Sequence, residues 1–172
     1  YASRHDMLTE LPNRTMMRDE LTEAIDLASR TGARVGVLLM DLNLFKEVND
    51  TYGHAVGDRL LTMVAGRIKA QVRPGDLAAR LGGDEFAVVL PGVEDHISAV
   101  RIAQRIRESI SRPFTMDDVT VTIDVSIGIA LYPDDGTQID PLIQAADSAM
   151  YVAKRTGTRI EVVGIDRGEA HG

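Results

Sequence analysis

The stretch Arg80-Leu81-Gly82-Gly83-Asp84-Glu85-Phe86-Ala87-Val88-Val89-Leu90 places two glycines and two carboxylates between two apolar runs. Residues 77–81 and 86–90 are predicted strands, and Gly-Gly between such runs is a strong hairpin signal. The turn would present Asp84 and Glu85 at a sheet edge, where a bare glycine backbone lets a ligand come close. Carboxylates in that setting suit a cation that carries a phosphate, although most hairpin turns of this composition only connect strands.

The composition predicts one globular domain over residues 1–172. Hydrophobic residues make up 44% of the 172 residues and charged residues 26%, which allows a sizeable core. The net charge of −7 argues against binding to nucleic acid, while metal ions can still join acidic side chains to the phosphates of a nucleotide. The chain has no cysteine, so it can form neither a disulfide nor a thiolate metal site.

No targeting or membrane segment is visible in the sequence. No apolar run approaches the roughly 18 residues that span a bilayer, and nothing resembles a signal peptide. We therefore expect no membrane contact from this segment. The chain starts at Tyr1 rather than Met, so we expect a cytoplasmic domain excised from a larger, multidomain protein. Whether that larger protein carries a membrane anchor is left open.

Apolar periodicity predicts alternating helices and strands along the chain. The predicted helices are residues 13–31, 57–72, 94–111 and 140–155, with a short helical or irregular segment at 43–50. Besides the hairpin, the predicted strands are 35–40, 119–129 and 159–163. The strand at 119–129 alternates, so one of its faces should lie on the core. The helix at 94–111 should turn one apolar side inward, made of Ile97, Val100, Ala103, Ile106 and Ile110.

This order of elements predicts an α+β domain. Adjacent hairpin strands and helical crossovers imply a central mixed, mostly antiparallel sheet of about five strands, flanked by helices. Asp41 follows the apolar strand 35–40, and Asp84 lies at the hairpin tip. If the two strands are neighbours, both acids lie at one edge of the sheet and suit Mg²⁺. Taken alone, an acid at the position of Asp41 more often only ends a strand or faces solvent.

A long motif after the first strand resembles the GGDEF domain of diguanylate cyclases. It is Asp41-Leu42-Asn43-Leu44-Phe45-Lys46-Glu47-Val48-Asn49-Asp50-Thr51-Tyr52-Gly53-His54-Ala55-Val56-Gly57-Asp58, and Gly82-Gly83-Asp84-Glu85-Phe86 follows it. Three further segments resemble the family's opening and closing motifs: residues 6–14, 126–130 and 146–154. The motifs extend from residue 6 to about 157, so the resemblance covers nearly the whole chain. It implies a fold of the nucleotide-cyclase or polymerase-palm type, with the Gly-Gly-Asp-Glu-Phe hairpin at the active site.

The resemblance implies an enzyme that condenses two GTP molecules into cyclic di-GMP and releases two pyrophosphates. Phosphoryl transfer of this kind needs in-line positioning and neutralisation of charge, largely by Mg²⁺, with Mn²⁺ as a second candidate ion. The matching metal ligands are Asp41, Asp84 and the backbone carbonyl of Leu42, with Glu85 for a second ion. Asp84 and Glu85 are the implied catalytic acids, and Asp84 also matches the proposed proton acceptor. The two GTP sites must face each other, so a homodimer is expected at least transiently.

The same resemblance assigns the substrate contacts. Asn49 and Asp58 match the pair that reads guanine, since a carboxylate accepts from N1–H and the 2-amino group. The other matching positions line or approach the triphosphate: Phe45, Lys46, Gly82, Gly83 and Lys154. Asp58 could instead be a helix N-cap, Lys46 a solvated charge and Phe45 a core residue.

One position departs from the family pattern. After Lys154 the family usually continues to a basic residue at the place that Thr158 occupies, and Arg159 comes one position later. A shift by one residue in a strand points a side chain to the opposite face. One contact to the terminal phosphate is therefore in doubt, with Arg155 and Arg159 as candidates to replace it.

A second ligand site is expected upstream of the hairpin. Arg73 and Asp76 match the family's R-x-x-D motif, which binds cyclic di-GMP and inhibits the enzyme. An arginine fork can bind a phosphate or a guanine edge. Arg101 and Arg105, one helical turn apart, are candidate partner arginines. The alternative for Arg73 and Asp76 is a surface ion pair.

Two functions therefore compete. The first is an active diguanylate cyclase with product inhibition. The second is a catalytically weak or inactive domain that binds GTP or cyclic di-GMP and regulates a fused domain, such as a phosphodiesterase. The Thr158 departure motivates the second function, and the intact acids motivate the first.

Overall fold

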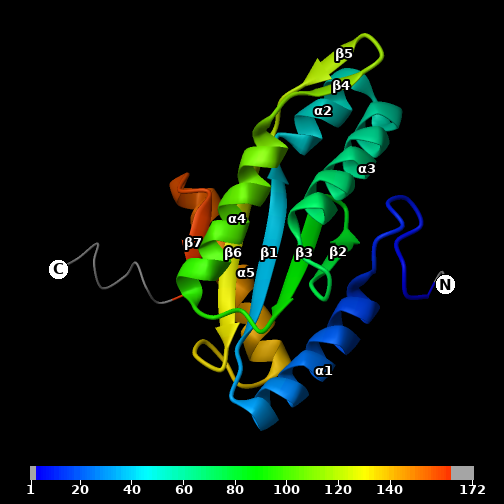
Figure 1. Ribbon diagram of the computed structural model, residues 1–172. Coiled ribbons are helices and arrows are strands. Elements are labelled where there is room, and N and C mark those ends of the chain that lie inside the picture. Colours follow the sequence, from blue (N-terminus) through cyan, green and yellow to red (C-terminus); the bar gives the residue numbers. More distant parts are fainter. Residues whose placement is uncertain (1–2, 164–172) are drawn as a thin grey trace.

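A five-stranded mixed sheet lies at the centre of the computed structural model, which describes residues 3–163 (Figure 1). Its strand order is β2-β3-β1-β6-β7, and only the β6–β7 pair is parallel. The five strands of this sheet are Val35–Asn43 (β1), Leu77–Gly82 (β2), Glu85–Pro91 (β3), Asp124–Tyr132 (β6) and Ile160–Val162 (β7). The predicted α+β class and mostly antiparallel sheet are confirmed.

Helices cover both faces of the sheet. The helices are Arg14–Thr31 (α1), Phe45–Tyr52 (α2), His54–Gln71 (α3), His96–Ser111 (α4) and Ile139–Thr156 (α5). Alternate residues of β1 divide between two cores, because successive strand side chains point to opposite faces. Leu38 and Met40 pack with α3 and α4, whereas Val37 and Leu39 pack with α1 and α5. The ribbon accordingly shows three layers (Figure 1).

The ends of α1 follow from its sequence. The Asn13 side chain accepts a hydrogen bond from the Met16 backbone N–H, which makes it the N-cap. Gly32 ends the helix in the left-handed conformation, with φ 76°. Both ends were predicted from the sequence. No described helix has the length and apolar character that crossing a bilayer requires.

The prediction of one strand at 119–129 was wrong. A two-stranded hairpin, Phe114–Met116 (β4) and Val119–Val121 (β5), lies outside the main sheet, and β6 begins only at Asp124. The apolar alternation runs through both segments, so periodicity alone did not reveal the break between them. The expected single core face was also wrong for β6, because residues 125–131 are buried throughout between α4 and α5.

Four further sequence predictions need correction. Ile97, expected on the inward side of α4, is 64% exposed, because the buried face is centred on Ala99, Ala103 and Ile106, about half a turn away around the helix. The third helix begins at His54 rather than near residue 57, and Gly53 is its N-cap residue. Asp58 is therefore inside α3 and is not an N-cap. The strand β1 continues two residues beyond Asp41, since Leu42 and Asn43 pair with β6.

Gly128 lets α5 approach the sheet closely. A Cβ atom at this position would overlap the backbone of Ala146 and Met150, which belong to α5. The glycine is thus needed for the distance between β6 and α5. That distance in turn sets the position of Lys154 near the end of α5.

Candidate functional site

The glycine-acid turn forms the predicted hairpin. Gly82 pairs with Glu85, so Gly83 and Asp84 are the two central residues of the turn. Gly82 and Gly83 have φ values of 138° and 50°, a region that side-chain-bearing residues rarely adopt. A register shift between Arg80 and Gly82 adds a bulge just before the turn.

The carboxylates of two strands meet at this end of the sheet. Strand β1 pairs with β3, and Asp41 lies directly opposite Glu85. Residues opposite each other in an antiparallel pair point to the same face, here the face that α5 covers. The backbone N–H of Leu42 donates to the carbonyl of Asp84 at 3.2 Å. The expectation that Asp41 and Asp84 share one edge of the sheet is therefore confirmed.

The electrostatics of the site favour a bound cation. Burial, followed by the neighbouring Asp41 carboxylate, raises the pKa of Asp84 to about 6. Lys154 Nζ donates to Asp41 Oδ2 at 2.6 Å, and this hydrogen bond raises the pKa of the lysine. The other oxygen, Asp41 Oδ1, is buried and has no hydrogen-bond partner in the described part of the chain. Burying a carboxylate oxygen without a hydrogen-bond partner costs free energy. Asp41 Oδ1 is therefore available to bind a ligand such as a cation.

The donor set fits a hard divalent cation. Mg²⁺ prefers a few carboxylate and carbonyl oxygens and keeps positions for phosphate oxygens. The available oxygens are Asp41 Oδ1, the Asp84 and Glu85 carboxylates and the backbone carbonyl of Leu42. No group of three or more His, Cys, Asp or Glu side chains is already arranged around a metal position within residues 3–163. In this arrangement Lys154 provides the positive charge for Asp41.

The predicted guanine contacts lie on two adjoining helices. Asn49 is in α2 and Asp58 is in α3, with exposed or half-exposed side chains. Gly57 keeps the two helices close, because a Cβ atom there would overlap the Asn49 side-chain amide. The position of Asn49 thus depends on a glycine directly before Asp58.

The residues expected along the triphosphate differ in exposure. Phe45 is buried in the core on the α3 side, which agrees with the alternative that its side chain is structural. Lys46 is 86% exposed and lies 3.7 Å from Asp50, a surface ion pair. Leu44, at the start of α2, has a φ of 72°, which is uncommon for a residue with a side chain.

Thr158 stands where the family pattern has a basic residue, and within the described residues neither nearby arginine supplies the positive charge that it lacks. The Thr158 hydroxyl donates to Glu161 at 3.2 Å. Arg159 pairs instead with Asp124 at 3.2 Å, and Arg155 lies over the ring of Tyr151. Neither arginine therefore replaces the missing contact in this arrangement.

Arg73 and Asp76 form an ion pair at the corner between α3 and β2. Asp76 accepts from the Arg73 backbone N–H at 3.0 Å and from its Nε at 3.3 Å. Arg105 reaches the carbonyl of Gln71, near this corner, at 3.5 Å. Arg101 lies one turn away on α4 and lines a different pocket, next to Ile97. Of the two candidate partners, the structure brings Arg105 nearer to Arg73.

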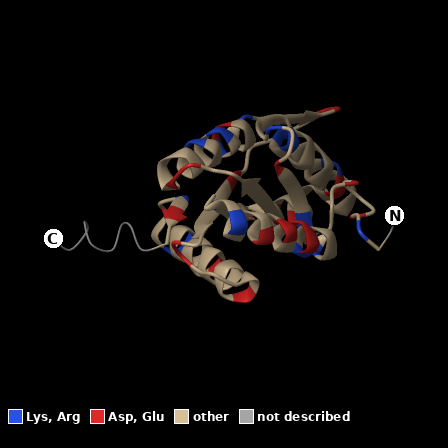
Figure 2. Ribbon diagram, turned by 60° about the horizontal axis from the view of Figure 1, so that its bottom comes forward, with Lys and Arg blue, Asp and Glu red and all other residues tan. Residues whose placement is uncertain are grey.

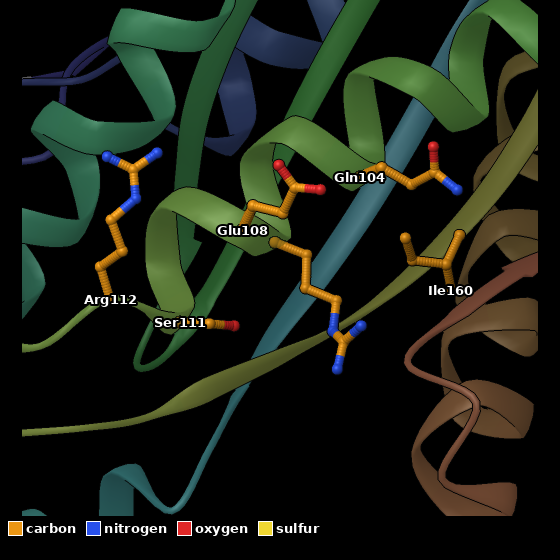
Figure 3. A pocket seen from close by; sticks show the side chains of 6 residues that line it. Gln104, Glu108, Ser111, Arg112 and Ile160 are labelled. Atoms are coloured by element: carbon orange, nitrogen blue, oxygen red, sulfur yellow. The ribbon is translucent and has the colours of Figure 1, made fainter.

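A pocket of about 590 Å³ lies away from the carboxylates, between the end of α4 and β7 (Figure 3). Gln104, Glu108 and Ser111 come from α4, and Ile160 closes one side. Nearby, Arg107 and Arg159 both hold Asp124, so these cations serve a structural contact.

Sequence reasoning missed Arg80 as a site residue. Its guanidinium donates to the carbonyl of Gly83 at 3.1 Å from Nε and at 2.8 Å from a terminal nitrogen. It also pairs with Asp6 at 2.9 Å. An arginine two residues before a Gly-Gly turn was the available signal, but nothing in the sequence showed that Asp6 would lie beside it.

Comparisons with known proteins identify the family of this chain. Residues 3–159 match the family described as diguanylate cyclase, GGDEF domain. MucR of Pseudomonas aeruginosa, a bifunctional diguanylate cyclase/cyclic di-GMP phosphodiesterase, is 49% identical over 89% of this chain and 22% of its own length. Diguanylate cyclase TpbB of the same species is 45% identical over 90% of this chain and 36% of its own length. The chain thus spans about a fifth to a third of these curated relatives.

Solved structures show the same fold. The GGDEF domain of TpbB superimposes with a TM-score of 0.88 at 42% identity, covering 91% of this chain and 99% of the other. The GGDEF domain of DgcB from Caulobacter crescentus, solved in complex with cyclic di-GMP, gives 0.86 at 32% identity over 95% and 97% of the two chains. The chain therefore belongs to the GGDEF-domain family of diguanylate cyclases, which acts in bacterial cyclic di-GMP signalling.

Proposed function

We propose that this domain is a diguanylate cyclase that condenses two GTP molecules into cyclic di-GMP and two pyrophosphates. The observation that carries the proposal is the meeting of Asp41 with the Asp84–Glu85 turn, where a buried carboxylate oxygen has no partner. Family membership supports the same reaction. We take residues 3–163 as one catalytic domain.

Asp41, Asp84, Glu85 and the carbonyl of Leu42 are the proposed ligands of Mg²⁺ or Mn²⁺. When bound, these ions supply neutralisation of the charge that develops on the phosphoryl oxygens. An ion at the partnerless Asp41 Oδ1 would leave Lys154 on Oδ2. The lysine side chain is half exposed, and we propose that its ammonium also contacts the nucleotide's phosphates.

The domain's own residues would orient the nucleotide. Asn49 and Asp58 present an amide and a carboxylate, which match the guanine edge and mismatch the donor pattern of adenine. Lys46 and the start of α2 at Phe45 are proposed to face the triphosphate, with Gly82 and Gly83 allowing close approach. We propose Asp84 as acceptor of the proton from the 3′-hydroxyl that attacks the α-phosphate, while pyrophosphate leaves.

Each 3′-hydroxyl must attack the other nucleotide, so two copies of the domain must face each other. We therefore propose a homodimer during turnover. We also propose that the product inhibits the enzyme by binding at Arg73 and Asp76, with Arg105 and Arg101 as partners. The DgcB structures in complex with cyclic di-GMP support a product site in this family.

A second candidate function is nucleotide-dependent regulation without turnover. It is favoured by Thr158, because the described structure puts no cation there and turns Arg159 toward Asp124. A relative named as a cyclic di-GMP phosphodiesterase, NbdA of Pseudomonas aeruginosa, is 35% identical to this chain over 155 residues. In this case the domain would bind GTP or cyclic di-GMP and act on a fused phosphodiesterase domain.

Incubation with GTP and Mg²⁺ separates the two functions. We expect cyclic di-GMP by mass spectrometry, no product from ATP, and loss of product in Asp84→Ala. Asp117→Ala, an exposed acid on the β4–β5 hairpin, is the matched control and should keep full activity. If the wild-type domain binds GTP and dimerises but makes no product, regulation is the function instead.

A further inference from the structure

A fully buried serine lies directly opposite Asp41 in the sheet. Ser126 of β6 is 0% exposed and pairs with Asp41 across the antiparallel β1–β6 ladder. Side chains opposite each other in such a pair point to the same face, with Cβ atoms about 4.5–5.5 Å apart. A serine hydroxyl and an aspartate carboxylate can close that gap with a hydrogen bond. Ser126 is therefore well placed to donate to the unpaired oxygen, Asp41 Oδ1.

The Ser126 hydroxyl bonds to Asn43 instead. Asn43 lies two residues beyond Asp41 on β1, so its side chain is on the same face and diagonal to Ser126. Its Nδ2 donates to Ser126 Oγ at 3.0 Å, and Ser126 Oγ donates to Asn43 Oδ1 at 3.3 Å. One side-chain amide thus engages the hydroxyl both as acceptor and as donor.

The other polar neighbours also leave Asp41 Oδ1 free. Lys154 Nζ donates to the second oxygen, Asp41 Oδ2, at 2.6 Å. The backbone N–H of Leu42 donates to the carbonyl of Asp84. The nearby Asp84 and Glu85 side chains only accept hydrogen bonds when they are ionised. Within the described residues, Ser126 is thus the hydroxyl that could satisfy Asp41 Oδ1, and Asn43 holds it.

We infer that Asn43 is a positioning residue: it holds the Ser126 hydroxyl away from Asp41 Oδ1 and so keeps that oxygen free to bind a divalent cation. The inference rests on the proposed function for the identity of the cation site and adds Asn43 to it. Without the amide, the hydroxyl would turn to the oxygen opposite it. An ion would then have to displace a hydrogen bond to a charged acceptor, which weakens its binding.

Binding of Mn²⁺ alone tests this role. Electron paramagnetic resonance of free Mn²⁺ measures the affinity of the wild-type domain, and Asp41→Asn should weaken it at least tenfold. Asn43→Ala should weaken it at least fivefold, because the released hydroxyl competes with the ion. Asn43→Asp keeps an acceptor for the hydroxyl and should bind Mn²⁺ at least as tightly as the wild type.

Three results of this titration overturn the inference. They are no Mn²⁺ binding by the wild type, binding that is unaffected by Asp41→Asn, and equal affinity in Asn43→Ala and the wild type. An Asn43→Asp variant as weak as Asn43→Ala also contradicts it, because the hydroxyl would then have its acceptor and the ion would still bind poorly.

Removing the serine separates this role from a general loss of structure. In Asn43→Ala/Ser126→Ala no hydroxyl is left to compete, so the Mn²⁺ affinity should return to within twofold of the wild type. Ser126→Ala alone should also stay within twofold. If Asn43 only stabilised the strand, the second substitution would leave the affinity low or lower it further. A double variant as weak as Asn43→Ala therefore contradicts the inference.

Ser109→Ala is the matched control for the second substitution. It removes the other buried serine of the described residues, which lies on α4. It should neither change the Mn²⁺ affinity of the wild type nor restore that of Asn43→Ala. If Asn43→Ala does not fold, Asn43→Val replaces it, because a β-branched residue favours a strand and also lacks a partner for the hydroxyl. The same loss and the same recovery with Ser126→Ala are expected.

Kinetics give a second readout. The Mg²⁺ concentration for half-maximal rate should rise at least fivefold in Asn43→Ala, whereas kcat at saturating Mg²⁺ should change less than twofold. A lower kcat with an unchanged Mg²⁺ requirement contradicts the inference. Mn²⁺ binding with this loss and recovery, but without cyclic di-GMP, disproves the cyclase proposal alone. An active cyclase whose Asn43→Ala variant binds Mn²⁺ like the wild type disproves this inference alone.

Discussion

At the residue scale, Gly57 decides where the proposed guanine contact Asn49 can lie. Gly57→Ala places a methyl group against the Asn49 amide, which is the flexible end of a side chain and can move. We expect the fold to persist and the KM for GTP to rise about tenfold, a loss of about 1.4 kcal/mol of binding. Steady-state kinetics measure the change.

Gly66→Ala is the matched control for that substitution. It lies on the same helix, and a Cβ atom there meets no atom within 4 Å. Its KM should equal that of the wild type, and its stability should rise by about 0.5–1 kcal/mol from helix propensity. An unchanged KM in Gly57→Ala would remove Asn49 from the guanine site.

Thr158 is the second residue whose effect can be measured. An arginine here would add the positive charge that the family pattern places after Lys154. Thr158→Arg should therefore lower the KM for GTP several-fold and change kcat little, because the added contact serves the bound substrate and the transition state alike. Thr156→Arg adds the same charge two positions earlier and should leave KM unchanged. Equal KM values for all three proteins would show that position 158 does not face the triphosphate.

At the element scale, close packing of α5 on β6 depends on Gly128. Gly128→Ala would drive a methyl group into the helix backbone, which cannot move as a side chain can. Overpacking of this kind costs about 3 kcal/mol of unfolding free energy. Urea denaturation measures the loss, with Gly66→Ala as the reference. A loss below about 1 kcal/mol would mean that α5 can shift, and with it Lys154.

Asp124 links α4 to the end of the sheet. From its ion pairs we expect the unfolding free energy to depend on pH. Burial works to raise its pKa, but hydrogen bonds from Arg107 and the Val125 backbone, with the charges of Arg107 and Arg159, outweigh it. The folded-state pKa therefore lies below the ordinary 3.8. The stabilisation is complete above that ordinary value and is lost as the pH falls through the lower folded value.

The expected result is that the unfolding free energy depends on pH with a different slope in the wild type and in Asp124→Asn. Below about pH 4 the unfolding free energy of the wild type should fall more steeply than that of Asp124→Asn, which should already be less stable at pH 7. Urea titrations across this range measure both. Asp117→Asn, an exposed ion-pair partner of Arg59, should keep the wild-type slope. Parallel curves for wild type and Asp124→Asn would contradict the assignment.

Most elements were predictable because their patterns are local. Asn13 and Gly32 mark the ends of α1, and the Gly-Gly turn marks the β2–β3 hairpin. The break after Val121 was not predictable, because apolar alternation continues across it into β6. The pairing of Arg80 with Asp6 joins residues 74 positions apart, which no local pattern records.

At the scale of the whole molecule, charge is distributed rather than separated. The chain carries a net charge of −7, and basic and acidic residues occur on the same helices (Figure 2). The charge that matters for the proposed reaction is therefore local: three carboxylates near one lysine at the end of the sheet.

The most direct test is one time course with GTP, cyclic di-GMP and pyrophosphate measured together at several protein concentrations. We expect two GTP consumed and two pyrophosphates released for each cyclic di-GMP, with a specific rate that rises with protein concentration as dimers form. Removal of Mg²⁺ by chelation should stop all three changes. GTP that binds to a dimeric protein but is not consumed, or is consumed without cyclic di-GMP, would show that the domain is not a diguanylate cyclase.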